Sequence, residues 1–224
     1  MTNSIIVRRG LDVAMSIGML LLMSYQIAGD AIHEWLGIAM TLLVVVHNFW
    51  HRNWYKNILK GSYMPLRMLF LVINGGLLVT FALTAWTGMS MSRDAVPFLE
   101  GMLPRMTAKQ WHLGFSYWCF IWMSLHVGLH LQRVLSLDAL RNKGRKSMAE
   151  GVLILAGAYG IYVLIRDNVF DYLTFQTHFV MFDFTKSSFG VLLDTWCMAI
   201  PFVLIAYYGS RGMQGKKRIN LSDG

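Results

Sequence analysis

Cysteine and charged residues are both scarce in this chain of 224 residues. The two cysteines, Cys119 and Cys197, lie in separate apolar stretches, and no Cys-x-x-Cys-His motif occurs. Covalent attachment of a c-type haem is therefore excluded, and both thiols are expected to be buried and inert. Only 14% of the residues are charged, whereas 55% are hydrophobic. This balance predicts an integral membrane protein.

Long runs with few or no charges define six predicted membrane spans. A helix needs about 20 predominantly apolar residues to cross a hydrocarbon core of about 30 Å. The spans are expected within 9–30, 34–52, 68–92, 110–132, 151–165 and about 189–208. The fifth is short, and it becomes long enough if Arg166 extends to the interface. The predicted fold is all-α: an up-down four-helix bundle with two additional C-terminal transmembrane helices.

Basic residues predict the orientation, because cytoplasmic loops carry an excess of lysine and arginine. An even number of spans puts both termini on one side, and fifteen of the twenty basic residues fall there. They are Arg8, Arg9, Arg52, Lys56, Lys60, Arg67, Arg133, Arg141, Lys143, Arg145, Lys146, Arg211, Lys216, Lys217 and Arg218. Both termini are therefore expected in the cytoplasm. The net charge of +8 fits positive loops beside anionic lipid and needs no nucleic-acid partner.

The chain divides at a basic loop that begins near Arg141. Four spans with six of the seven histidines precede this loop, and two spans follow it. We predict a four-span core at 1–140, a two-span extension at 149–212 and a cytoplasmic tail at 213–224.

Four histidines repeat one spacing. His33 and His47 are separated by thirteen residues, and so are His112 and His126. On a helix this step leaves two side chains on one face, about 40° apart around the axis and about 21 Å apart along it. A weak repeat accompanies the spacing: Leu-Gly follows soon after the first histidine of each pair, and each copy ends in His-x-x-x-His. The second and fourth spans therefore correspond and run in the same direction.

Imidazoles in a membrane cost free energy unless something binds them. Neutral imidazole is a good axial ligand of haem iron, and cofactors in helix bundles are bound by residues on facing helices. We predict a transmembrane cytochrome with two b-type haems. His33 would pair with His112 near the outer surface, and His47 with His126 towards the cytoplasm.

Other polar residues in or near the spans are secondary candidates. His51 and His130 lie one turn beyond the inner ligands, where each could replace its neighbour, contact a haem propionate or lie at the lipid headgroups. Asp194 lies inside the last span and is a candidate quinone or proton site, although it could instead pair with a neighbour. His178 belongs to an aromatic outer segment that could form a quinone pocket or only an interfacial surface.

Glycines in the four-span core allow either close helix contact or a flat macrocycle against the backbone, and the sequence does not separate these uses. They are Gly37, Gly75, Gly76, Gly88, Gly114 and Gly128.

Two other functions use the same histidines. The two His-x-x-x-His pairs resemble the histidine boxes of di-iron membrane oxidases and hydroxylases, but the chain lacks a His-x-x-His-His box. That interpretation also leaves His33 and His112 unexplained. A divalent-metal transporter would need carboxylates beside the histidines within the membrane. A zinc protease is less consistent still, because His33-Glu34 lacks the second histidine of His-Glu-x-x-His.

Several motifs resemble the flavinylation-associated cytochromes, small bacterial membrane proteins with a four-helix haem core. They are HEWLG with His47 fourteen residues after its histidine, LLVTFALTAWTGMSMS, WHLGFSYW and HVGLH, and the resemblance covers about 11–134. It implies His33, His47, His112 and His126 as haem ligands. It argues against His51, because the matching position is more often asparagine in that family.

The resemblance also implies a location and partners. The chain would lie in the bacterial cytoplasmic membrane, in contact with lipid, and would carry electrons from membrane quinol to an extracytoplasmic flavoprotein or other redox protein. It would thus be an electron-transfer cytochrome b with quinol oxidoreductase activity. Electrons would pass between the inner and outer haems, whose potentials depend on ligation, burial and neighbouring hydrogen bonds.

Overall fold

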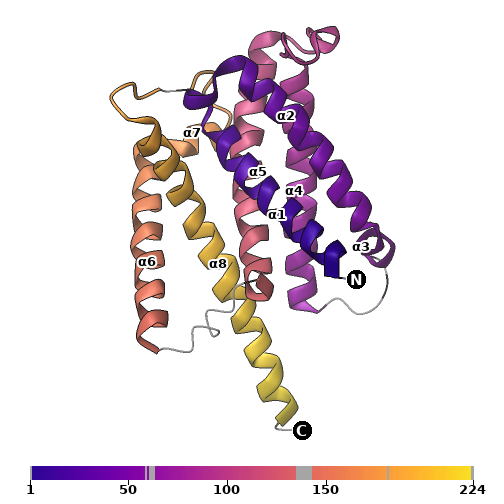
Figure 1. The fold of residues 1–224 in the computed structure, drawn as a ribbon, viewed down its shortest axis with the longest axis vertical. Helices are drawn as coiled ribbons and strands as arrows, with labels where there is room; N and C mark the ends of the chain where they lie inside the picture. Colours follow the sequence, from indigo (N-terminus) through magenta and orange to yellow (C-terminus); the bar gives the residue numbers. More distant parts are fainter. Residues whose placement is uncertain (1, 59, 61–63, 135–142, 181, 223–224) are drawn as a thin grey trace.

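A computed structural model describes residues 2–58, 60, 64–134, 143–180 and 182–222, and within these ranges the chain is helical without strands (Figure 1). Arg141, at the predicted division of the chain, lies outside the described residues. The elements are α1 (Thr2–Met23), α2 (Tyr25–Trp50), α3 (Arg52–Asn57), α4 (Pro65–Met89), the 3₁₀ turn η1 (Pro97–Leu99), α5 (Arg105–Val134), α6 (Lys143–Arg166), α7 (Val169–Leu173) and α8 (Ser188–Ser222).

The six long helices run alternately between two ends of the molecule (Figure 1). Both chain termini point towards the end that carries α3 and the start of α4, which we call the inner end. The connections around η1 and α7 lie at the opposite end, which we call the outer end. Helices α2 and α5 carry the repeated histidines and run in the same direction, as the repeat predicts.

Four of the described helices are long and apolar enough to cross a membrane by length and composition: Tyr25–Trp50, Pro65–Met89, Ser147–Arg166 and Ser188–Met213. These four indicate a multi-pass membrane protein. Helix α5 is long, but its three histidines and three tryptophans lower its mean hydropathy. A complete set of six spans stays a prediction.

The first predicted span differs from the observed helices. Helix α1 ends at Met23, and α2 begins at Tyr25 with a break at Gly29, where φ is 68° and ψ is 177°. This left-handed backbone favours glycine, which has no Cβ to clash. The buried hydroxyl of Ser24 donates to the Leu20 carbonyl and to the Thr195 hydroxyl, and so ties the turn to α8. Hydropathy placed the boundary near Asp30 because the apolar composition continues through this turn.

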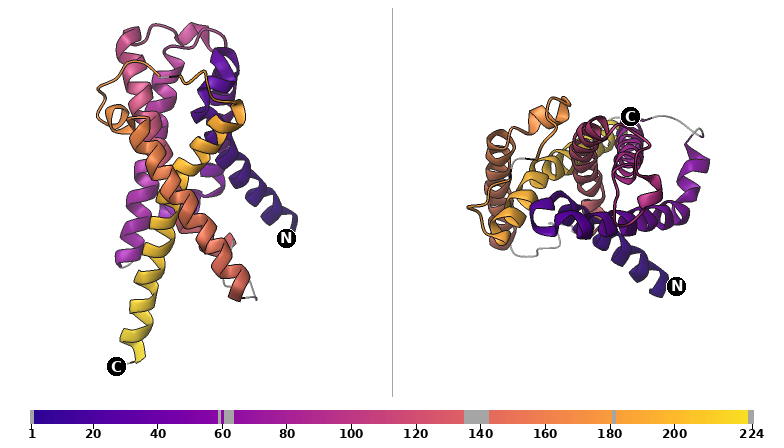
Figure 2. Two further views of the ribbon diagram at one scale, coloured as in Figure 1. Left: turned by 90° about the vertical axis from the view of Figure 1, so that its left-hand side faces the viewer. Right: turned by 90° about the horizontal axis from the view of Figure 1, so that it is seen from above.

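The C-terminal helices pack directly on the histidine-bearing core. Helices α6, α8, α5 and α4 lie in a row, and the α1–α2 hairpin lies across one side of it (Figure 2). A Cβ at Gly128 would collide with the Val203 carbonyl, and one at Gly160 with the Cys197 carbonyl. These glycines therefore let α8 approach both α5 and α6 closely. The two cysteines are free and buried, as expected.

Each of the six long helices begins before its predicted span. Helix α6 starts at Lys143, eight residues before the predicted fifth span, and α8 continues to Ser222. The segment predicted as a cytoplasmic tail at 213–224 is thus helical as far as Ser222, and its location stays a prediction.

Candidate cofactor site

The rings of His33 and His112 meet at the outer end. Their centres are 6.0 Å apart, and the ring planes cross at 81°. An imidazole nitrogen binds a first-row metal at about 2 Å and lies about 1 Å from its ring centre, so two imidazoles on opposite sides of one iron have centres roughly 6 Å apart. The observed separation fits the axial ligands of one haem.

His112 is fixed against α4. Its Nδ1 is 3.0 Å from the Thr84 carbonyl oxygen, to which it donates, and the Thr87 hydroxyl lies 3.5 Å away. A Cβ at Gly88 would approach the His112 Cε1 to 2.9 Å, so glycine is needed for the ring to lie here. This contact assigns Gly88 to histidine packing.

His33 is positioned by its neighbour Glu34. The Glu34 carboxylate accepts a hydrogen bond of 2.8 Å from the Ser92 hydroxyl. It also accepts backbone N–H bonds of 2.8–3.2 Å from the three residues that follow Ser92. Carboxylates with several such donors are held strongly. The Tyr25 ring meets the His33 ring edge-on at 5.1 Å, and His33 Nδ1 is buried without a hydrogen-bond partner among the described residues.

Two residues from neighbouring helices hold the inner histidines. His47 Nδ1 is 3.0 Å from the Asp12 carboxylate on α1, and His126 Nδ1 is 2.8 Å from the Asn74 side-chain oxygen on α4. Within the described residues these two rings make no direct contact like that of the outer pair. The inner pairing therefore stays a prediction.

Two of the four predicted ligands, His112 and His126, thus donate a hydrogen bond through Nδ1, whereas His47 Nδ1 lies at ion-pair distance from Asp12 without hydrogen-bond geometry. Histidines that bind metals donate one ring nitrogen to a carboxylate or carbonyl, which fixes the tautomer and leaves the other nitrogen for the metal. In the part of the chain that the structure describes, Nε2 of these ligands has no hydrogen-bond partner. The residues present therefore fit haem ligation.

The sequence interpretation missed the supporting residues Asp12, Glu34 and Asn74. A signal was available, because Asn74 is the one carboxamide in α4 and Asp12 is the one acid in α1. An isolated polar side chain in an apolar helix needs a partner, because burying it alone is unfavourable. The sequence does not say which partner it finds.

The other two histidines of the core differ from each other. The exposed His51 stacks on His47 at 4.4 Å, and its Nδ1 is 2.9 Å from the His47 backbone oxygen. It therefore turns back onto its own helix. His130 lies 4.6 Å from the His126 ring and 5.6 Å from the Phe70 ring. His130 thus contacts rings on both α5 and α4, whereas His51 contacts its own helix.

Some glycines of the four-span core serve close packing between side chains and helices. A Cβ at Gly76 would collide with Trp122, and one at Gly114 with Phe175, so these glycines serve packing. At Gly37 and Gly75 a Cβ would meet nothing within 4 Å among the described atoms considered. Gly37 lies one turn from His33 on the same face of α2, and its use beside a macrocycle stays a prediction.

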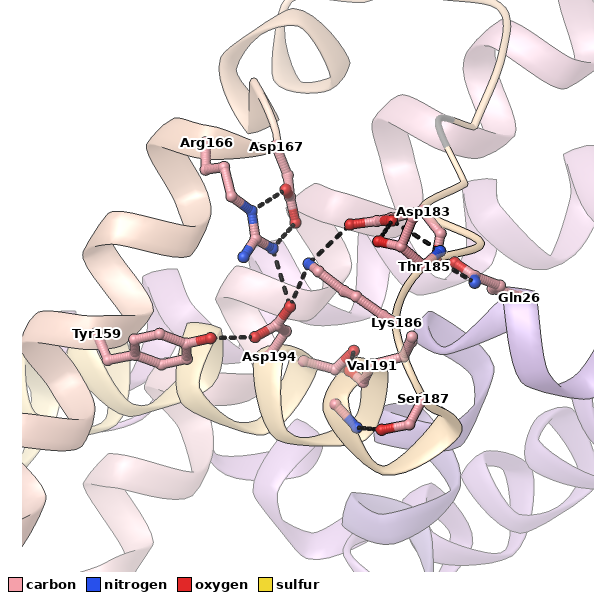
Figure 3. A network of polar contacts seen from close by, with 12 residues as sticks. Gln26, Tyr159, Arg166, Asp167, Asp183, Thr185, Lys186, Ser187, Val191 and Asp194 are labelled. Carbon is pink, nitrogen blue, oxygen red and sulfur yellow. Dashed lines mark hydrogen bonds and ion pairs between the residues drawn. The ribbon is translucent and has the colours of Figure 1, made fainter.

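Asp194 lies in a charged cluster at the outer end of α8 (Figure 3). Its Oδ2 accepts from Lys186 Nζ at 2.6 Å and from Arg166 Nη2 at 2.9 Å, and its Oδ1 accepts from the Tyr159 hydroxyl at 2.7 Å. Arg166 also pairs with Asp167. The cluster joins α6, α8 and the segment between α7 and α8. Asp194 is therefore paired with its neighbours, as one of the two interpretations of the sequence predicts. Its role with quinone or protons stays a prediction.

The outer segment before α8 is held to the start of α2. Gln26 on α2 donates to the Asp183 carbonyl at 2.9 Å, and Phe182 stacks on Tyr25. The hydroxyl and backbone N–H of Thr185 hold the pKa of the Asp183 carboxyl below its usual value. His178 is partly buried in this segment, and its Nδ1 has no hydrogen-bond partner among the described residues.

No protein-family model matches the chain, and no curated protein or solved structure matches it.

Replacing Asn74 with leucine should weaken haem binding at the inner site about 10–100-fold, because His126 loses the acceptor that fixes its tautomer. Titration of haem into the haem-free protein measures this affinity. Asn74→Asp retains an acceptor at the same place and should bind more tightly than the leucine variant. Equal affinities of wild type and Asn74→Leu at both haem sites would contradict this role.

Proposed function

We propose that this chain is a multi-pass membrane cytochrome with two b-type haems, bound by His33 and His112 at the outer end and by His47 and His126 towards the inner end. The observation that carries the proposal is the 6.0 Å separation of the His33 and His112 rings. The Nδ1 bonds of His112 and His126 support it, because they leave Nε2 available, and so does the ion-pair contact of His47 Nδ1 with Asp12. When bound, each haem iron accepts and returns one electron.

In this proposal six helices span the cytoplasmic membrane of a bacterium with both termini in the cytoplasm. The alternation of the long helices and the positions of the termini support an even number of spans (Figure 1). Electrons would pass from membrane quinol to an extracytoplasmic flavoprotein or another redox protein. The motif resemblance to the flavinylation-associated cytochromes supports this choice of partners.

The chain's own residues have separate tasks in this function. The four histidines bind the irons, Asp12 and Asn74 fix the inner imidazoles, and Glu34 fixes the start of α2 beside His33. Bis-histidine ligation leaves no open position on the iron and so favours electron transfer over oxygen chemistry.

The two metal-centre alternatives have less support. Within the described ranges, no group of three or more histidine, cysteine, aspartate or glutamate side chains is placed to hold a metal ion. A di-iron oxidase or a metal transporter needs such a group, whereas a haem needs two axial histidines.

The absorption spectrum of the purified protein, reduced minus oxidised, tests the proposal, together with haem quantitation as the pyridine haemochrome. We expect two b-type haems per chain with low-spin bands. A preparation without haem that contains stoichiometric iron or zinc would instead favour the histidine-box enzyme or the transporter.

A further inference from the structure

A pocket of about 440 Å³ lies at the inner end, between α3 and the first turns of α4. Its apolar walls are Trp54, Ile58, Phe70 and Leu71. Trp54 and Ile58 are four residues apart, about one helical turn, so their side chains lie on the same side. That side faces the first turns of α4 across the pocket. The volume falls in the usual range for small-molecule sites, which are mostly apolar with a few polar groups.

The polar groups of the pocket are Asn57, Lys60 and Arg67. Arg67 Nη2 donates to the Asn57 carbonyl at 2.7 Å and to the Ile58 carbonyl at 2.9 Å, which fixes the end of α3 against α4. The Asn57 amide and the Lys60 ammonium are hydrogen-bond donors. The lining thus combines an apolar surface with donors suited to oxygen atoms.

The pocket is connected to a predicted haem ligand by aromatic contacts. Phe70, in its wall, meets the His130 ring at 5.6 Å, and His130 meets the His126 ring at 4.6 Å. A molecule in the pocket would therefore lie two side chains from an inner ligand. The pocket borders the first turns of the candidate span α4, where a lipid-soluble molecule can enter from the membrane.

We propose that this pocket binds the ring of a membrane quinol and is the place where electrons enter. This inference rests on the proposed function and adds the location of its donor. On oxidation the quinol breaks its two O–H bonds, releases two protons to water at the inner surface and becomes quinone. Its two electrons leave one at a time past Phe70 and His130 towards His126, and the outer redox partner takes them up. The site, between α3 and the start of α4, is at the opposite end of the molecule from α7 and the start of α8, the part of the chain that carries His178 and Asp194 (Figure 1).

The test uses a photoreactive azidoquinone on the full-length, haem-loaded protein, with the labelled peptide identified by mass spectrometry. We expect the label within 52–71. Leu71→Trp fills the pocket and should reduce both the labelling and the rate of haem reduction by quinol about tenfold or more. Val72→Trp is the matched control, because Val72 is 54% exposed and lies outside the lining. Dithionite should reduce the haems of both variants alike.

The outcomes separate this inference from the proposed function. Two haems reduced by quinol, with the label at 174–187 or with labelling unchanged in Leu71→Trp, would overturn the pocket and keep the cytochrome. Loss of the label on adding phosphatidylglycerol, with quinol-driven reduction unchanged, would assign the pocket to a lipid headgroup and overturn the inference. A protein without haem would remove the proposed function, whereas the labelling reports on the pocket independently.

Discussion

Replacing His33 with alanine should leave one haem of the two, and replacing His112 should remove the same haem. The two rings lie 6.0 Å apart, so each supplies one side of a single iron. The inner histidines are held by Asp12 and Asn74, which do not depend on the outer pair. We therefore expect half the haem per chain in both variants and one remaining step in a redox titration, at the same potential.

External imidazole provides the control for this result. It can occupy the space left in His33→Ala and restore the second haem, which a misfolded protein would not allow. His51→Ala should keep both haems, because His51 bonds back to its own helix. Loss of different haems from His33→Ala and His112→Ala, each recovered with imidazole, would contradict the pairing.

The outer pair was predictable because it depends on regular local geometry. The spacing from His33 to His47, repeated from His112 to His126, fixes one face of each helix without knowledge of the rest of the fold. The common direction of α2 and α5 follows from the repeat. The four apolar helices that meet the length and composition required of a span follow from hydropathy.

The supporting contacts were not predictable because they depend on which helices become neighbours. Asn74 reaches His126 only because α4 packs on α5, and Asp12 reaches His47 only because α1 packs on α2. The turn at Ser24 is hidden for another reason. Apolar residues precede Ser24, and Ile27 and Ala28 follow soon after it, so the hydropathy falls only briefly where the chain reverses.

The contacts of Asp194 in the fold could not be predicted from its position in the sequence. In the sequence it is one acid in an apolar span, about 12 Å along the helix from Lys186, which leaves open both a role with protons and pairing with a neighbour. In the fold the chain turns before α8, which brings Lys186 Nζ to 2.6 Å and places Arg166 from α6 on the same oxygen. The negative charge of the Asp194 carboxylate is balanced by the two cations. This arrangement favours a structural role in which Asp194 joins α8 to α6.

Replacing Asp194 with leucine should destabilise the protein by roughly 2–4 kcal/mol, because it leaves Arg166 and Lys186 partly buried without their shared anion. The Asp194 side chain is 9% exposed, and those of Arg166 and Lys186 are 26% and 24% exposed. Such a change should lower the apparent Tm of the detergent-solubilised protein by roughly 5–10 °C. Differential scanning fluorimetry at fixed detergent and protein concentration measures this shift.

Two control variants accompany Asp194→Leu, whose Tm and reduction rate together distinguish a structural anchor from a proton-transferring acid. Tyr159→Phe removes one neutral donor from Asp194 and should cost only about 1 kcal/mol. Asp171→Asn changes an exposed acid on α7 and should be nearly neutral. As an anchor, Asp194→Leu lowers the Tm but leaves quinol-driven haem reduction near the wild-type rate at temperatures where the protein is folded. An unchanged Tm with slowed reduction would instead identify Asp194 as part of the quinone or proton site.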